Sequence, residues 1–398
     1  LSREESVEEI HDPMVDQFFQ AIYGLSAVDA WGLGLLPNGD SYYNRNVAHD
    51  RQIAGFGEAT YAFTDRWKLT LGGRISKMTF DLNHFADGLQ NFGPDGATAS
   101  QSETAFTPKV SMSFQMSPDH LFYATYAKGF RPGGGNPPLI DQCADGLVGL
   151  GYPDGKAPLQ YSSDKTNSYE IGSKNNFNNR LKLATSLYWI KWNGIQQNVY
   201  VSTCGLQFTD NLGTAVAKGF DLQAEARIGA HWDLEAALGY TSARYSKDSK
   251  AALALDGDAI SGEAAIGGSP GAIAPWTASL GLQYRFDGIG DGGFVRFDYQ
   301  YQSRNNWLAA SQDPRSSQYT PYTYTVSSNK FASLRAGAAF KGWDVSLFVD
   351  NLFDTHTTTN YLYSVVDPYF PGDSPPGPMY SNFTFRPRTI GITATYRQ

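Results

Sequence analysis

The C-terminal end of the chain carries the pattern that decides the fold. Residues 343–349 read WDVSLFV, so two valines and a leucine fall on one face of an extended strand. Residues 388–397 read RTIGITATYR, in which isoleucine, alanine and tyrosine alternate with threonine, glycine and arginine. Alternation of this kind is typical of a strand with one apolar and one polar face. The polar face is small, hydroxylated or charged, which suits a wet interior better than a dry core.

The same unit repeats toward the N-terminus: a strand, a tight turn, a second strand, then a long polar loop. The pattern predicts about thirteen strands, with short and long connections alternating. The expected strands are 51–63, 67–82, 102–116, 120–131, 165–177, 181–201, 213–228, 232–247, 274–286, 294–308, 329–340, 343–349 and 388–397.

Strand length and the chemistry of the polar face separate a membrane barrel from a soluble sandwich. In 220–228 the polar face holds Asp221, Gln223, Glu225 and Arg227. Strands of soluble sandwiches are about half as long as these. We therefore expect an all-β fold, a partial antiparallel transmembrane β-barrel with a water-filled interior. Aromatic residues at strand ends, most of them beside the short turns, indicate an interfacial girdle. They are Trp67, Phe177, Trp232, Trp276, Phe294, Phe340 and Trp343.

Composition agrees with this reading. Of 398 residues, 18% are charged and 14% aromatic, and 41 are glycine, which favours strands and turns. No apolar run approaches the roughly 18 residues of a membrane-spanning helix. The mean hydropathy of −0.37 does not exclude a membrane barrel, because its strands alternate lipid-facing and lumen-facing residues. A net charge of −8 without a basic patch argues against nucleic-acid binding.

The unequal connections predict an orientation. In bacterial barrels the short turns are periplasmic and the long loops extracellular. The polar segments that should gather at the outer mouth are 83–101, 132–164, 202–212, 248–272, 309–328 and 355–382.

Residues 1–50 differ from the rest, and the barrel is expected over 51–398. Asp12 followed by Pro13 is a favourable helix start, and Gly24 can end the helix. We interpret 1–50 as a loop insertion with one or two short helices. A separate small helical domain is the alternative, although its apolar content is low for a core of its own.

Several stretches resemble TonB-dependent outer-membrane receptors. Residues 350–354 read DNLFD and precede the closing RPRTIG strand, and 123–133 read YATYAKGFRPG. Residues 56–61 and 169–174, FGEATY and YEIGSK, are similar to two further barrel segments. The resemblance covers about residues 51–398. About thirteen strands is fewer than the roughly 22 of plugged transporters. We therefore expect the C-terminal part of a receptor, without the plug domain and the first strands.

The resemblance implies a function in the bacterial outer membrane. Such receptors bind a scarce ligand, a ferric siderophore, vitamin or glycan, and import it with energy from the TonB complex of the inner membrane, which acts through the plug. The implied partners are TonB, outer-membrane lipid and the small-molecule ligand; the protein is expected to be a monomer, not an enzyme, and to hold no cofactor. The alternatives are a passive porin-like channel and a soluble all-β binding protein.

Candidate ligand-binding residues lie in or beside the long loops. Arg131 stands at the mouth, where a guanidinium can contact an anionic ligand, although a solvated rim arginine is the simpler reading. Trp307, Tyr361 and Tyr363 have rings that can stack on a catechol or a sugar, or else pack within the loops. The six histidines form no closely spaced pair, so no protein metal site is expected.

Cys143 and Cys204 fall in two different long loops on the expected outer side. An oxidising compartment permits a disulfide between them. Closing a loop of this length would stabilise the fold by roughly 4 kcal/mol.

Overall fold

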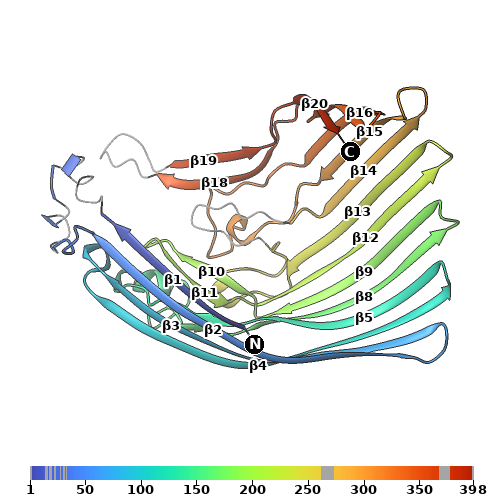
Figure 1. Cartoon of the computed structure of the whole chain (residues 1–398). Helices are drawn as coiled ribbons and strands as arrows, with labels where there is room; N and C mark the ends of the chain where they lie inside the picture. Colours follow the sequence, from blue (N-terminus) through green and yellow to red (C-terminus); the bar gives the residue numbers. More distant parts are fainter. Residues whose placement is uncertain are drawn as a thin grey trace.

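The computed structural model describes residues 2–13, 17, 20–21, 24–26, 28–29, 32, 34–260, 273–366 and 377–396. Within these ranges the chain is almost entirely β-structure, which confirms the all-β fold class. The principal sheet is antiparallel and has fourteen strands (Figure 1). In spatial order they are β1 (Ser2–Asp12), β2 (Tyr42–Ala62), β3 (Trp67–Asp87), β4 (Asp95–Ser117), β5 (His120–Arg131), β8 (Asp164–Phe177), β9 (Leu181–Asn193), β12 (Thr214–Ile228), β13 (Trp232–Tyr245), β14 (Trp276–Phe286), β15 (Gly293–Gln302), β16 (Asn329–Phe340), β17 (Trp343–Asp350) and β20 (Thr389–Tyr396).

Shorter elements lie in the long connections. Three small hairpins are β6 with β7, β10 with β11, and β18 with β19. Their bounds are β6 (Gly134–Gly135), β7 (Gln160–Tyr161), β10 (Gln196–Val201), β11 (Leu206–Asn211), β18 (Thr358–Val366) and β19 (Gly377–Thr384). The described helices are α3 (Ala144–Gly149) and the 3₁₀ turns η1 (Leu89–Asn91), η2 (Asp141–Cys143), η3 (Lys250–Ala252) and η4 (Ala310–Gln312).

The sheet curves into a trough, and β10 and β11 lie inside the curve (Figure 1). Neighbouring strands of the sheet follow one another in chain order. The numbering skips only the short strands of the long loops, which belong to separate small sheets. Within the described ranges β1 and β20 each pair along one edge only, so the sheet is open. None of the described helices is long and apolar enough to cross a membrane.

Strand register gives the sheet one apolar and one polar face. In one row Ala236, Leu280 and Tyr299 pair directly across β13, β14 and β15. In a parallel row Leu347 pairs with Ile392. We call this the outer face. Ile390 and Ile392 are 72% and 69% exposed there, as expected of side chains that face a surrounding apolar phase rather than a protein core.

The opposite, inner face carries the ionised residues. The Arg296 guanidinium lies 2.8 Å from both the Glu235 and Asp298 carboxylates. Arg285 lies 2.8 Å from Asp233. Each charge on this face of β13–β15 thus has a partner of opposite sign on the same or a nearby strand, which suits a polar lumen.

Aromatic side chains border the outer face at two levels. Beside the short turns, Trp232 contacts Tyr284 with ring centroids 4.7 Å apart. Near the long loops, Tyr240 contacts Trp276 at 4.8 Å. Trp232 and Tyr240 are eight residues apart in β13, or about 27 Å of strand. With a tilt of about 45°, this is about 19 Å of height, comparable to the roughly 25 Å apolar band of outer-membrane barrels.

The DNLFD segment closes the end of the β17–β20 pair. The buried Asn351 has a positive φ of 53°, and its side-chain amide donates to the carbonyls of Thr355 and Arg386, both at 3.0 Å. The backbone N–H of Arg388 donates to Asp354 Oδ1 at 3.0 Å. These bonds fix where the chain leaves β17 and where it enters β20, because asparagine tolerates the left-handed conformation and its amide satisfies distant backbone groups.

One sequence-based expectation about the N-terminal half is wrong. Residues 2–12 form β1 and residues 42–50 begin β2, so the interpretation of 1–50 as a loop insertion fails at both ends. Along its whole length, one edge of β1 is hydrogen-bonded to β2, which favours strand over loop. The helix expected after Asp12 falls largely outside the described residues.

Some strand boundaries also differ from those expected from the sequence. The loop expected over 83–101 is mostly strand, because β3 and β4 continue pairing as far as Ala86 and Asp95. The strand expected over 181–201 breaks at Gly194, whose φ is +64°, and the chain then turns inward as β10. All thirteen expected strands otherwise have counterparts, and β1 is the fourteenth.

Candidate functional site

Four long loops at the end away from the short turns fold against one another. We call residues 132–163, 194–213, 246–260 and 303–328 the mouth assembly. The first two are joined by the Asn136 side chain, which donates to Thr209 O at 2.8 Å and accepts from Thr209 N at 2.9 Å. The Tyr152 hydroxyl donates to Asp210 Oδ2 at 2.6 Å, and burial raises the pKa of Tyr152 far above its ordinary value.

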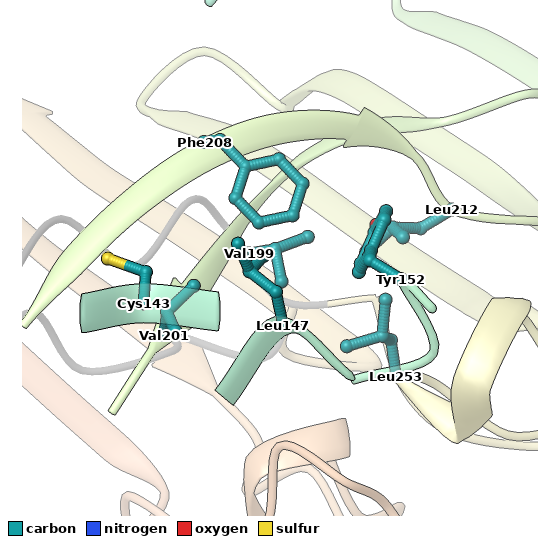
Figure 2. Packing of buried hydrophobic residues seen from close by; sticks show 8 residues of the cluster. All are labelled: Cys143, Leu147, Tyr152, Val199, Val201, Phe208, Leu212 and Leu253. Carbon is teal, nitrogen blue, oxygen red and sulfur yellow. The ribbon is translucent and has the colours of Figure 1, made fainter. Parts of the chain in front are cut away.

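The mouth assembly has an apolar core of its own, distinct from the sheet. Figure 2 shows side chains from η2, α3, β10, β11 and the 246–260 loop pointing toward one another. The most deeply buried are Cys143, Leu147, Val199, Val201 and Leu253, each no more than 1% exposed. The core members are Cys143, Leu147, Tyr152, Val199, Val201, Phe208, Leu212 and Leu253. A buried cluster from separate loops makes these loops one folded unit.

Cys143 and Cys204 form a disulfide at the edge of this core, with their Cα atoms 5.2 Å apart. The bond joins the 132–163 loop to the turn between β10 and β11. The two residues are 61 positions apart in sequence. Because so long a segment is closed, the cross-link restricts the unfolded loops strongly.

We call the fourteen-stranded sheet the wall. The glycine run at 133–135 allows the first loop to pack closely against it. A Cβ added at Gly133 would clash with the Tyr161 carbonyl, and one at Gly135 would lie 2.9 Å from Ala99 Cβ. The run therefore serves close packing of β6 against β4 and β7.

Arg131 is engaged by the protein at the base of the mouth assembly. Its guanidinium donates to Asp164 Oδ2 at 2.7 Å and to Gln196 O at 2.8 Å, and lies 5.6 Å from the Trp192 ring centroid. The Asp164 side chain is 3% exposed, whereas that of Arg131 is 42% exposed. Arg131 therefore neutralises a buried carboxylate and ties β5 and β8 to β10.

The 246–260 and 303–328 loops are joined by backbone hydrogen bonds. Ala259 N donates to Leu308 O at 2.7 Å, and Ser317 N donates to Ala252 O at 2.9 Å. We call the contact between residues 246–260 and 303–328 the seam. Ala254 and Ala309 are fully buried along it. Small side chains allow the two loop backbones to approach closely.

A pair of buried carboxyl groups lies in the same seam. Asp258 is hydrogen-bonded to Asp313, and both are nearly inaccessible to solvent. Burial raises the pKa of the Asp258 carboxyl to about 6, while hydrogen bonds from Arg315 lower the pKa of Asp313 to about 2. Between these two pH values one proton is shared by the pair and one negative charge remains, which Arg315 balances at 2.6 Å.

The Trp307 indole ring is covered by the Arg244 guanidinium rather than open for stacking. The Arg244 guanidinium carbon lies 4.8 Å from the Trp307 ring centroid. The Trp307 backbone N–H donates to Asn305 Oδ1 at 2.9 Å, which fixes the local turn. A guanidinium on an indole is a favourable cation–π arrangement, and it places a positive charge at the mouth.

Three tyrosines stack at the base of the β18–β19 hairpin. The rings of Tyr324 and Tyr361 are parallel within 12°, with centroids 4.0 Å apart, and Tyr380 meets Tyr324 edge-on at 5.5 Å. Tyr361 is 1% exposed, and its hydroxyl donates to Tyr324 O. Tyr324 is 38% exposed and is therefore the ring that this stack presents. Tyr363 pairs with Tyr380 in the hairpin, and its side chain lies outside the described residues.

The inner face is hollowed by a cavity of about 480 Å³. Amide and hydroxyl groups share its lining with apolar side chains, so it can offer hydrogen bonds to a solute. Its lining includes Gln223, Thr277, Ser279, Gln300, Gln302, Thr359 and Phe385.

The structure brings together only part of the predicted site. Arg131 and the disulfide belong to the mouth assembly, Trp307 lies in its seam, and Tyr361 supports Tyr324 from below. Sequence reasoning missed Tyr324, the Asp258–Asp313 pair and the Arg244 stack, because each depends on contacts between separate loops. Among the described residues there is no cluster of three or more His, Cys, Asp or Glu able to hold a metal.

Known proteins resemble this chain in sequence. The metal-pseudopaline receptor CntO of Pseudomonas aeruginosa is 27% identical over 190 residues, which are 47% of this chain and 23% of that protein. The pesticin receptor of Yersinia enterocolitica is 22% identical over 198 residues, 50% of this chain and 27% of its own length. The match thus spans about a quarter of these curated relatives.

Solved structures show the same fold over most of the chain. The ferric yersiniabactin uptake receptor FyuA from Yersinia pestis has a TM-score of 0.65 at 17% identity, and covers 90% of this chain and 47% of its own. The copper transporter OprC has a TM-score of 0.57 at 18% identity, and covers 90% and 48%. The chain thus spans about half the length of these receptors.

The family model described as TonB dependent receptor-like, beta-barrel matches residues 15–352. This range includes the wall from β2 to β17 and all four loops of the mouth assembly. Proteins of this family lie in the outer membrane of Gram-negative bacteria, with short periplasmic turns and long extracellular loops. The chain belongs to the TonB-dependent receptor family and is an outer-membrane β-barrel chain.

Proposed function

We propose that this chain forms most of the barrel wall and outer mouth of a receptor that imports a scarce metal chelate, such as a ferric siderophore, with energy from the TonB complex. The observation that carries the proposal is the mouth assembly, a disulfide-linked unit with its own core above a polar inner face. The names of the relatives, receptors for metal-pseudopaline, pesticin and ferric yersiniabactin, support a metal chelate as the ligand class.

The ligand would first meet the exposed parts of the mouth. Tyr324 offers a ring supported by Tyr361, which suits a flat aromatic or conjugated chelator. Arg244 on Trp307 adds positive charge for an anionic chelate. The cavity on the inner face would receive the ligand next, through its amide and hydroxyl groups. The metal is carried within the ligand, so no protein metal site is needed.

Transport measured in a deletion strain tests this function. Cells lacking the gene are expected to lose uptake of one member of a panel of radiolabelled iron, copper and zinc chelates, and to recover it with the intact gene. Collapse of the inner-membrane proton gradient is expected to stop uptake as well. Unchanged uptake of every chelate would contradict the proposal, and uptake that persists without the gradient would favour the passive, porin-like alternative.

A further inference from the structure

The outer face of the sheet carries a row of lysines close to the long-loop end. We call Lys77, Lys128, Lys191, Lys218 and Lys330 the lysine row. Each lies on a different strand, β3, β5, β9, β12 and β16. Register places each on the apolar face: Lys77 pairs with Ile53, and Lys218 pairs with Trp189.

The lysines lie at one height above the short turns. Lys77 and Lys191 follow Trp67 and Leu181, the first residues of their strands, by ten positions, and Lys128 follows His120 by eight. Ten residues span about 33 Å of strand, or about 23 Å of height at a tilt of about 45°. That height equals the top of the roughly 25 Å apolar band. The row therefore lies where hydrocarbon gives way to lipid headgroups.

Lys128, Lys191 and Lys218 are close enough to act together. Lys128 and Lys191 both pair with Asn167, from opposite sides, so they lie two strands apart, or about 10 Å. Lys191 pairs with Val216, two residues from Lys218, which makes these two lysines diagonal neighbours on adjacent strands. An aromatic row of Tyr126, Tyr169 and Trp189 lies directly below them, toward the short turns.

The five lysines have no carboxylate partners among the described residues. Within the described strands, none of them has an Asp or Glu partner within 4 Å. Lysines of the inner face differ: Lys109 lies 3.0 Å from Glu58, and Lys182 lies 3.3 Å from Glu225. A chain with net charge −8 thus keeps one surface basic where lipid headgroups would lie.

We infer that the lysine row binds the phosphate groups of lipids in the outer leaflet of the outer membrane. Charge complementarity supports this partner, because clustered ammonium groups at a membrane surface attract anionic headgroups by about 1 kcal/mol each. Long lysine side chains lay their methylenes over the apolar band and reach the headgroups with the charge. The row faces lipid and not the lumen, so its role is separate from ligand import.

Native mass spectrometry of the natural protein, extracted from the outer membrane in detergent, tests this inference. The probes are bisphosphorylated lipid A and the same glycolipid without phosphate. The variant is Lys191→Gln with Lys218→Gln. Its matched control is Lys174→Gln with Lys182→Gln, which removes two lysines from the inner face. A heat-dependent shift in electrophoretic mobility shows that each variant is folded.

The row variant is expected to bind bisphosphorylated lipid A roughly thirtyfold more weakly than the unchanged protein, because two ammonium groups are lost. The control should bind it normally, and the glycolipid without phosphate should bind all three proteins equally. Equal binding of lipid A by the row variant and the unchanged protein would overturn the inference, as would an equal loss in the control. Complete displacement of lipid A by inorganic phosphate would also overturn it, since the site would then recognise a free anion.

Discussion

The wall of the sheet and the mouth assembly are stabilised in different ways. In the wall, every strand is paired with its neighbours in register, and side chains alternate between an apolar outer face and an ionised inner face. In the mouth, short hairpins and turns are joined by a small apolar core, a disulfide and individual side-chain bonds. The wall depends on a repeated local pattern, whereas the mouth depends on specific contacts between distant segments.

The comparison teaches where sequence change is tolerated. A wall position keeps its role as long as its face keeps its character, because any apolar side chain suits the outer face. A mouth position such as Asn136 or Asp313 has a particular partner, and replacement leaves that partner unsatisfied. Ligand specificity can therefore change in the mouth without disturbing the wall beneath it.

The largest effect is expected from removing the disulfide. Replacing Cys143 and Cys204 by serine should lower the free energy of unfolding the mouth assembly by roughly 4 kcal/mol, because the unfolded loops regain their freedom. Hydrogen exchange should become faster over 144–149 and 196–211, and stay slow in β12 and β13. Uniform exchange across wall and mouth would show that the two regions do not unfold separately.

A charge placed on the outer face should disturb the wall almost as strongly. Leu280→Lys would put an ammonium group near the middle of the apolar band, at a cost of about 3 kcal/mol. Ser279→Lys, the adjacent position on the inner face, is the matched control and should cost much less. The free energy of unfolding in lipid bilayers measures both. A greater cost for the Ser279 variant would reverse the assignment of the faces.

The seam of the mouth should respond to pH while the wall does not. The folded state raises the pKa of Asp258 to about 6 from an ordinary value of 3.8, so it binds this proton more tightly than the unfolded state. The stabilising contribution is complete below pH 4 and is lost as pH rises through 6, up to about 3 kcal/mol. Hydrogen exchange of Ala259 and Ser317, followed from pH 4 to 7, reports the seam.

Asp258→Asn is the control for this prediction, because the amide keeps the shape and does not titrate. The variant seam should be equally protected at pH 4 and pH 7. Asp313 has its pKa lowered to about 2, so its contribution is lost only as pH falls toward 2 and does not interfere. A pH dependence that persisted in the Asn variant would have another origin.

The smallest expected effect concerns ligand contact at Tyr324. Tyr324→Ala removes the exposed ring and should weaken binding of the transported chelate about fivefold, or about 1 kcal/mol. Tyr324→Phe keeps the ring and should bind nearly normally. Titration calorimetry with the chelate found in the uptake assay measures both. If the Ala variant bound the chelate as tightly as the unchanged protein, the Tyr324 ring would not contact the ligand.

The wall was largely predictable from sequence, for a physical reason. Strand periodicity of two is imposed by two different solvents on the two faces, so it is visible in each strand alone. The short turn implied between strands 165–177 and 181–201 contains Asn178 and Asn179, and both have the positive φ that asparagine tolerates in tight turns. β1 was missed because its sequence, SREESVEEIHD, is acidic rather than alternating, and only pairing with β2 makes it a strand.

The mouth was predictable only in outline. Cys143 and Cys204 could be assigned to long loops on the same side, because loop length alone gives the side. Arg131 was placed at the mouth correctly, but its buried partner Asp164 follows from the register of β5 and β8. The Asp258–Asp313 pair has no local signal, because its members are brought together by two loops that each look like ordinary polar sequence.

The most direct test of the account asks which medium touches each face. Single nitroxide labels at Leu280, Leu347 and Ile392, and at the adjacent Ser279, Ser346 and Thr393, can be compared in bilayers by their collision rates with oxygen and with a water-soluble nickel chelate. The account predicts that oxygen, which concentrates in hydrocarbon, reaches the first set more readily and the nickel chelate the second set, in strict alternation along each strand. Higher nickel collision rates at the leucine and isoleucine positions than at their neighbours would contradict a wall with lipid outside and water within.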